Sequence, residues 1–203
     1  KIKEDITSEI ASSFKSSIAI DTEATGLQIP ERDKLSLIQI CDEGGNVFII
    51  QPNKSNFKAP NLVSVLENEK ILKIGHFLRF DKNALEFFLK CKMKNIFDTK
   101  IASKIVRTYT DSHGLKNLVQ EFCNKSLDKR QGSSDWNKDI NELSDKQLEY
   151  AANDVIYLHK IKTELEAMLT RENRMDVFKK CLAFLDTRVE LDQSGFKFDI
   201  FEH

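Results

Sequence analysis

Glycine, proline and cysteine are scarce in this sequence, and each shortage narrows the class of protein. With only 7 Gly and 3 Pro in 203 residues, the chain is expected to form long regular elements joined by short loops. The four cysteines are scattered and show no C-x-x-C spacing: Cys41, Cys91, Cys123 and Cys181. This argues against a disulfide framework, so we expect reduced thiols.

Long hydrophobic runs and a large net charge are also missing. No apolar run approaches the length needed to cross a membrane, which predicts a soluble, cytoplasmic protein with no membrane partner. The formal net charge of −1 leaves no global basic field that could hold a long polyanion. If nucleic acid is the partner, the contact must be local or the substrate short.

The sequence that remains is typical of one globular domain. Its length suffices for a single substantial core, and no repeat, linker or low-complexity tract divides it. We therefore expect one domain over residues 1–203, without additional C-terminal helical nucleic-acid-binding domains.

Apolar segments predict the order of strands and helices. Segments 18–20, 35–40 and 47–50 predict three strands in an antiparallel meander, and 71–75 and 95–97 predict two more. Amphipathic stripes predict helices at about 1–15, 61–69, 78–90, 101–106, 115–122, 144–168 and 174–185. Asp98 stands just before one of these helices and is interpreted as its N-cap rather than as a catalytic residue. The fold class is α/β.

Two carboxylates, Asp21 and Glu23, end the first apolar strand. Their i, i+2 spacing places both side chains on one face of the strand. Two neighbouring anions repel each other and are costly to desolvate, so a divalent cation between them is the favoured explanation if the site is functional. A solvated acidic turn is the alternative for a D-x-E motif on its own.

Three later residues fit the same chemistry. Asp81 lies early in a predicted helix, and Tyr150 and Asp154 share one helical face at i, i+4 spacing. Taken singly, each is compatible with an ordinary residue at the rim of a core. Taken together, carboxylates from separate elements suit a pair of Mg²⁺ or Mn²⁺ ions in phosphodiester hydrolysis.

The motifs Asp21-x-Glu23, Asp81 and Tyr150-x-x-x-Asp154 resemble the three exonuclease motifs of the DEDD superfamily, in its tyrosine branch. Further stretches resemble ribonuclease D: 35–40, 97–99, 113–115 and 134–136. Chain length and the tail 199–203 are similar to the nanoRNase C group of short bacterial relatives. The resemblance implies a ribonuclease H-like exonuclease fold, in which the meander joins parallel strands in a mixed central sheet flanked by helices.

The resemblance also implies roles for the motif residues. Asp21 bridges two metal ions, Glu23 and Asp154 complete the first metal site, and Asp81 holds the second mainly through water. Tyr150 orients the attacking water. The implied activity is 3′-5′ hydrolysis of short RNA, including diribonucleotides, to nucleoside 5′-monophosphates. The implied assembly is a homo-oligomeric ring, with an octamer as one size.

Three residues are candidates for substrate binding, each with an alternative. Leu27 would pack on the terminal bases, or belong to the core. His76 would contact substrate; it stands where an Asn is often found in the second motif of the family. Trp136 would stack on a base, or fix the polar loop 124–141 to the core, which we favour.

Other functions remain open on the sequence alone. A ribonuclease D-like enzyme that trims tRNA, or a DNA 3′-5′ exonuclease, would use the same metal site. A non-enzymatic alternative is a nucleic-acid-binding module with an inactive site, but an intact set of four acids and a tyrosine argues against it. The sequence leaves open the substrate length, the choice of RNA or DNA, and the preferred metal.

Overall fold

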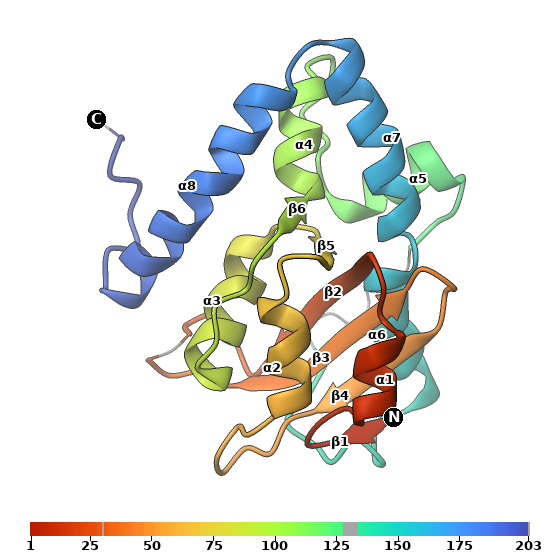
Figure 1. Cartoon of the computed structure of the whole chain (residues 1–203), viewed down its shortest axis with the longest axis vertical. Coiled ribbons are helices and arrows are strands. Elements are labelled where there is room, and N and C mark those ends of the chain that lie inside the picture. The colour runs from red at the N-terminus through yellow and green to blue at the C-terminus, as the bar shows by residue number, and fades with distance from the viewer. Residues whose placement is uncertain (30, 128–133, 203) are drawn as a thin grey trace.

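A mixed sheet of six strands lies at the centre of the computed structural model, which describes residues 1–29, 31–127 and 134–202 (Figure 1). Its order is β1-β4-β3-β2-β5-β6, with β2, β3 and β4 antiparallel, β5 and β6 parallel to the β2 direction, and β1 parallel to β4. The strands are β1 (Ile2–Lys3), β2 (Ser17–Ala24), β3 (Leu35–Asp42), β4 (Val47–Gln51), β5 (Leu72–Gly75) and β6 (Ile96–Asp98). The predicted meander and α/β class are confirmed.

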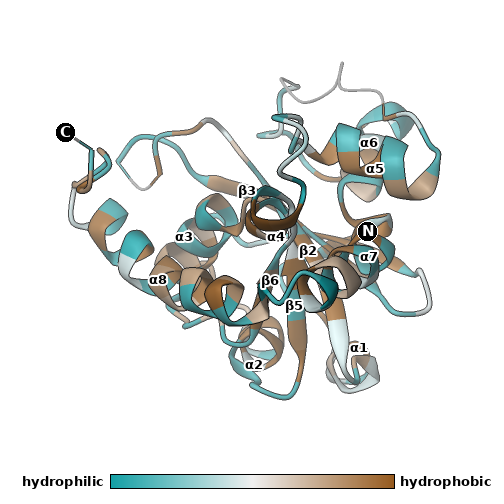
Figure 2. Cartoon of the chain, turned by 90° about the horizontal axis from the view of Figure 1, so that it is seen from above, coloured by the Kyte–Doolittle hydropathy of each residue, from teal (hydrophilic) through white to brown (hydrophobic). Residues whose placement is uncertain are grey.

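Helices cover both faces of the sheet. On one face lie α1 (Ser8–Ser13), α2 (Pro60–Glu67) and α3 (Leu78–Leu89); on the other lie α4 (Thr99–Val106), α5 (Leu115–Cys123), α6 (Asp145–Ile156) and α7 (Leu158–Arg171). The helix α8 (Met175–Gln193) packs along α3, α4 and α7. Figure 2 shows hydrophobic strands at the centre and polar residues on the outer turns of the helices.

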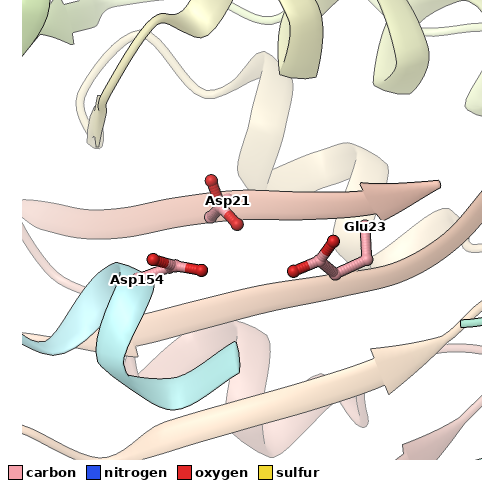
Figure 3. A group of neighbouring side chains, drawn as sticks. All are labelled: Asp21, Glu23 and Asp154. Carbon is pink, nitrogen blue, oxygen red and sulfur yellow. The ribbon is translucent and has the colours of Figure 1, made fainter. Parts of the chain in front are cut away.

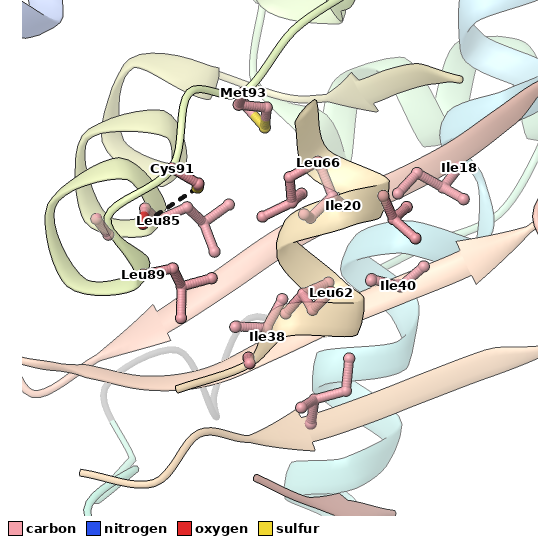
Figure 4. Close-up of a cluster of buried hydrophobic side chains, with 14 of the residues drawn as sticks. Ile18, Ile20, Ile38, Ile40, Leu62, Leu66, Leu85, Leu89, Cys91 and Met93 are labelled. Carbon is pink, nitrogen blue, oxygen red and sulfur yellow. Dashed lines mark hydrogen bonds between the residues drawn. The ribbon is translucent and has the colours of Figure 1, made fainter. Parts of the chain in front are cut away.

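Strand β2 separates the two faces by simple alternation of its side chains. Ile18 and Ile20 point toward α2 and α3, where they pack with Ile38 and Ile40 of β3 in a buried cluster (Figure 4). Ala19 lies on the opposite face, in the cluster beneath α4 and α7. Asp21 continues the Ala19 face, so the strand that builds the core also aims its carboxylates at the α6 side of the sheet.

Three helix predictions need correction. The segment 144–168 is two helices, because α6 ends at Ile156 and α7 begins at Leu158, with Tyr157 between them. The break lets α6 pack on β2, β3 and β4 while α7 packs on α4 and α5, which one straight helix could not do. The segment 1–15 contains β1 as well as a helix, and α8 continues beyond 185 to Gln193.

The four cysteines are free thiols, as their spacing predicted. Cys41 and Cys91 are buried, and burial raises the pKa of the Cys41 thiol to about 11 and that of Cys91 to about 12. Among the described residues, no helix combines the length and the apolar character that a membrane crossing requires.

Candidate active site

Three carboxylates converge on the face of the sheet that α6 covers. Figure 3 shows the side chains of Asp21 and Glu23 from β2 and of Asp154 from α6 pointing toward one another. One oxygen from each carboxylate lies within 4.8 Å of the others. The i, i+2 spacing on β2 supplies two of them, and the packing of α6 across β2 and β3 supplies the third. Residues more than 130 positions apart in the sequence are thus brought into one group.

The ionisation of this group is strongly perturbed. Burial, followed by the negative charges of Asp81 and Asp154, raises the pKa of Asp21 well above its usual range. Burial and the same two neighbours raise the pKa of Glu23 to about 9. In the metal-free protein, these carboxylates cannot all be charged at neutral pH. A cation placed among them would remove the repulsion and allow each to ionise.

Asp81 lies close to this group but outside the set of three. It sits in the first turn of α3, buried, and its Oδ1 accepts a hydrogen bond of 2.6 Å from Thr22 Oγ1. Thr22 alternates with Asp21 along β2, so Asp81 approaches the strand from the α3 side. Burial raises the pKa of Asp81 to about 7, against the effect of the Thr22 hydrogen bond.

Tyr150 lies one helical turn before Asp154 on α6. It is half-buried and lines a cavity that it shares with the three carboxylates. Burial, followed by the charges of Asp154 and Glu23, raises the pKa of its hydroxyl. The hydroxyl therefore keeps its proton throughout the physiological range and can act as a hydrogen-bond donor.

Trp136 packs against Tyr150, with 6.0 Å between the ring centroids. Its side chain is 3% exposed and belongs to a buried cluster with Leu37 and Ile140, which supports the interpretation that it fixes the loop to the core. Trp136 also lines the cavity, so contact with substrate stays a prediction. Lys129 and Arg130, which belong to the same predicted loop, lie outside the described residues.

The side chain of Gln51, at the end of β4, holds this loop in place. Its Nε2 donates to the Lys138 carbonyl at 2.7 Å, and its Oε1 accepts from the Ile140 amide at 3.0 Å. Both ends of one amide thus bond to the loop backbone just after Trp136. Through these two hydrogen bonds, strand β4 helps to hold the Trp136 indole beside Tyr150.

A cavity of about 720 Å³ opens over the carboxylates, within the range of small-ligand sites. Leu27 lines it and is 85% exposed, so the alternative that Leu27 belongs to the core is wrong. His76 also lines it, and its Nδ1 lies 2.9 Å from Thr99 Oγ1. Because Thr99 Oγ1 donates to the Gly75 carbonyl at 3.0 Å, it accepts from His76, which fixes the ring at the cavity wall.

Two further cavity residues were not identified from the sequence. Phe77 is 45% exposed and adopts a left-handed backbone conformation, with φ of 68°, which is rare for a bulky residue. The Nζ of Lys100 lies 4.2 Å from the centre of the Phe77 ring. Buried Asp98 holds this turn, because its carboxylate accepts from the Leu78 amide at 2.7 Å and the Phe77 amide at 3.3 Å. A short motif carries no signal for such a conformation.

The comparison with known protein families agrees with this geometry. A family model described as 3′-5′ exonuclease matches residues 2–170, which include all five motif residues. The chain belongs to this 3′-5′ exonuclease family. The resemblance drawn from the motifs is therefore confirmed at the level of the family.

Relatives of this exonuclease family member include a ribonuclease D and a DNA polymerase I. Ribonuclease D of Haemophilus influenzae is 35% identical over 159 residues, which are 77% of this chain and 38% of that protein. DNA polymerase I of Aquifex aeolicus is 35% identical over 152 residues, 74% of this chain and 24% of that protein. The chain therefore spans less than half the length of these curated relatives.

Solved structures of NrnC from Brucella melitensis match the whole chain. The structure with bound Mg²⁺ is 43% identical, with a TM-score of 0.91, and the match covers 100% of this chain and 97% of NrnC. A second NrnC structure, bound to pGG, has the same identity and coverage and a TM-score of 0.92. The similarity includes α8, which lies beyond the residues that the family model matches.

The donor set of this exonuclease family member fits hard divalent cations. Asp21, Glu23 and Asp154 offer carboxylate oxygens, and neither histidine nor cysteine joins them in the group that the described residues form. Mg²⁺ and Mn²⁺ prefer oxygen ligands, whereas zinc sites favour nitrogen and sulfur. The fold holds these three acids together although burial and mutual repulsion raise the pKa values of Asp21 and Glu23, as expected where a cation completes the site.

Proposed function

We propose that the chain is a 3′-5′ exonuclease that uses two divalent cations, Mg²⁺ or Mn²⁺, to hydrolyse short RNA to nucleoside 5′-monophosphates. The convergence of Asp21, Glu23 and Asp154 beneath a cavity carries the proposal, because it provides the carboxylate site that this reaction requires. Family membership supports the reaction, and the Mg²⁺-bound NrnC structure supports the choice of cation.

In this proposal, the four acids hold the cations and the tyrosine orients the attacking water. Asp21, Glu23 and Asp154 would hold one cation, with Asp21 shared by a second that Asp81 approaches from the α3 side. Bound cations would supply Lewis acidity, lowering the pKa of water and neutralising charge on the phosphoryl oxygens. The protonated Tyr150 hydroxyl would donate a hydrogen bond that orients the attacking water.

Several observations favour a short RNA substrate. NrnC, which aligns over the full chain, has been solved bound to pGG. The exposed Leu27 side chain stands at the cavity, where it can pack between or against terminal bases. Phe77 and His76 offer further ring surfaces on the wall, and Lys100 is available for phosphate. With a net charge of −1, the protein has no broad basic field for a long strand.

Loss of one metal ligand tests the reaction. Asp154→Asn should lower kcat/KM for pGG with Mg²⁺ by about 1,000-fold, equivalent to about 4 kcal/mol of transition-state stabilisation. Glu149→Gln, on the exposed face of the same helix, is the matched control and should act like the unsubstituted protein. Retained activity in folded Asp154→Asn protein would refute the proposal.

Substrate length separates the proposed specialisation from its alternatives. Turnover of pGG should exceed that of a longer RNA, and it should also exceed that of a DNA strand as long as that RNA. Equal rates on long RNA would favour a trimming enzyme like ribonuclease D, the name of several curated relatives. Preference for DNA would favour the proofreading type suggested by the match to DNA polymerase I. Binding without turnover of any substrate would indicate an inactive module.

We also propose that residues 1–203 act as one catalytic domain and that copies of the chain assemble into a ring-shaped homo-oligomer. Exposed hydrophobic side chains near the C-terminal end support self-assembly: Val177, Phe184, Phe196, Phe198, Ile200 and Phe201. Side chains of this type gain free energy when a second copy removes them from water.

A further inference from the structure

Gln39, in the middle of β3, is a buried polar residue without a hydrogen-bond partner. Its side chain has no exposed surface, and neither Nε2 nor Oε1 bonds to any residue that the structure describes. An amide left unpaired in this way is unfavourable, because its polar atoms lose their hydrogen bonds to water and gain none in the protein. Native proteins pair most buried polar atoms, so a residue that offers two unpaired atoms requires an explanation.

The register of the sheet places Gln39 beside the candidate metal ligands. Asp21 of β2 is its direct partner across the antiparallel pair. Directly opposite residues point to the same face, with Cβ atoms about 5 Å apart. Leu37 and Cys41, which alternate with Gln39 on β3, lie in the clusters on the α6 and α7 face. The Gln39 amide therefore lies on the face where Asp21 meets Asp154.

We propose that Gln39 is a positioning residue for the metal site. With cations bound, Nε2 would donate to a carboxylate oxygen of Asp21 or Asp154 and so orient that ligand, and Oε1 would accept from a water held at the site. Carboxylate ligands are oriented by such outer hydrogen bonds, and Mg²⁺ keeps several of its waters. This inference rests on the proposed function, and it assigns to Gln39 the two partners that its amide lacks.

Metal affinity, measured separately from activity, tests the inference. Isothermal titration with Mn²⁺ should give a Kd that is 10- to 100-fold higher for Gln39→Leu than for the unsubstituted protein. Half-maximal hydrolysis of pGG should require a correspondingly higher Mn²⁺ concentration. In EDTA, the melting temperature of Gln39→Leu should be unchanged or higher, because the substitution removes unpaired polar atoms from the core. If Gln39 only stabilised the fold, Gln39→Leu would lower the melting temperature in EDTA and leave the Kd for Mn²⁺ unchanged.

Ser36 provides a matched control on the same strand. It is equally buried, its Oγ also has no partner among the described residues, and it lies at a bulge without a register partner on β2. Ser36→Ala should leave the Kd for Mn²⁺ unchanged within twofold. If Gln39→Leu loses the native circular dichroism spectrum, Gln39→Met, which keeps the unbranched shape, takes its place.

The outcomes separate this inference from the proposed function. If the unsubstituted protein binds Mn²⁺ and hydrolyses pGG, and folded Gln39→Leu has a Kd within twofold of it, the positioning role is refuted and the exonuclease proposal stands. If the unsubstituted protein neither binds Mn²⁺ nor hydrolyses pGG, the exonuclease proposal fails and the role of Gln39 fails with it.

Discussion

Glu23 favours its protonated, uncharged form in the metal-free protein. Its pKa is raised from about 4.5 to about 9 by burial and by the charges of Asp154 and Asp81. The folded state therefore binds this proton more tightly than the unfolded chain does. The resulting stability is fully present below pH of about 4.5 and is lost as the pH rises through about 9. Asp21, whose pKa is also raised, acts in the same direction.

We therefore predict that the melting temperature in EDTA falls as the pH rises from 5 to 9. Glu23→Gln, which cannot ionise, should make this decline less steep. Saturating Mg²⁺ should flatten it in the unsubstituted protein, because the cation stabilises the charged carboxylates. Differential scanning fluorimetry over this pH range measures all three slopes.

The control for this prediction is Glu43, an exposed acid in the turn that links β3 and β4. Hydrogen bonds from Ser16 and Ser17 lower the pKa of Glu43, so it is ionised throughout the range tested. Glu43→Gln should leave the slope of melting temperature against pH unchanged. The explanation is wrong if Glu23→Gln and the unsubstituted protein show the same slope in EDTA.

At the scale of elements, Asp98 joins the starts of two helices. Its side chain accepts from the Lys100 and Ile101 amides at the start of α4, as the N-cap prediction requires, and from two amides at the start of α3. Because Asp98 is 1% exposed, the amides that it pairs are shielded from bulk solvent. The placement of Asp81, in the first turn of α3, depends on this shared cap.

Asp98→Ala should lower the free energy of unfolding by about 3 kcal/mol, because it removes a cap and leaves buried amides unpaired. Urea denaturation monitored by circular dichroism measures the change. Asp145→Ala, which removes an exposed acid from the first turn of α6, should cost less than about 1 kcal/mol. Equal losses in the two variants would show that Asp98 acts only through helix dipoles.

The sequence predicts those elements whose signal is local. The alternation in β2 and the turn residues between β3 and β4 identify the meander, because one face of each strand must be buried. The division of 144–168 at Tyr157 has no such signal, since its apolar stripe continues through the break. The helix breaks because its two halves pack on different surfaces: α6 packs on the sheet, and α7 packs on neighbouring helices.

The same distinction applies to the site. Asp21, Glu23, Tyr150 and Asp154 are recognisable because i, i+2 on a strand and i, i+4 on a helix place each pair on one face. Gln39 is recognisable only when the β2–β3 register is known, because its importance comes from the residue opposite. The positions of Phe77 and Lys100 at the cavity depend on a left-handed turn after β5, which Asp98 at the end of the neighbouring strand β6 holds by hydrogen bonds.

At the scale of the whole molecule, the sheet carries a hydrophobic core on each face and the carboxylates on the face that α6 covers, while α8 reaches beyond the sheet. Toward the end of α8 and in the residues after it, four aromatic side chains contact one another in pairs. The rings of Phe184 and Phe201 lie 5.7 Å apart, and those of Phe196 and Phe198 lie 6.0 Å apart. Phe201 is 76% exposed and Phe198 63%. This surface is the strongest candidate for contact between copies.

We predict that the double substitution Phe198→Ser and Phe201→Ser converts a homo-oligomer into a species of the monomer mass, 23.4 kDa, because each exposed ring gains free energy only when another copy covers it. Light scattering coupled to size-exclusion chromatography measures the mass. Tyr109→Ser removes another exposed aromatic ring, in the loop before α5, and should leave the mass unchanged. A monomeric mass for the unsubstituted chain would refute self-assembly, and an unchanged oligomer in the double variant would place the interface elsewhere.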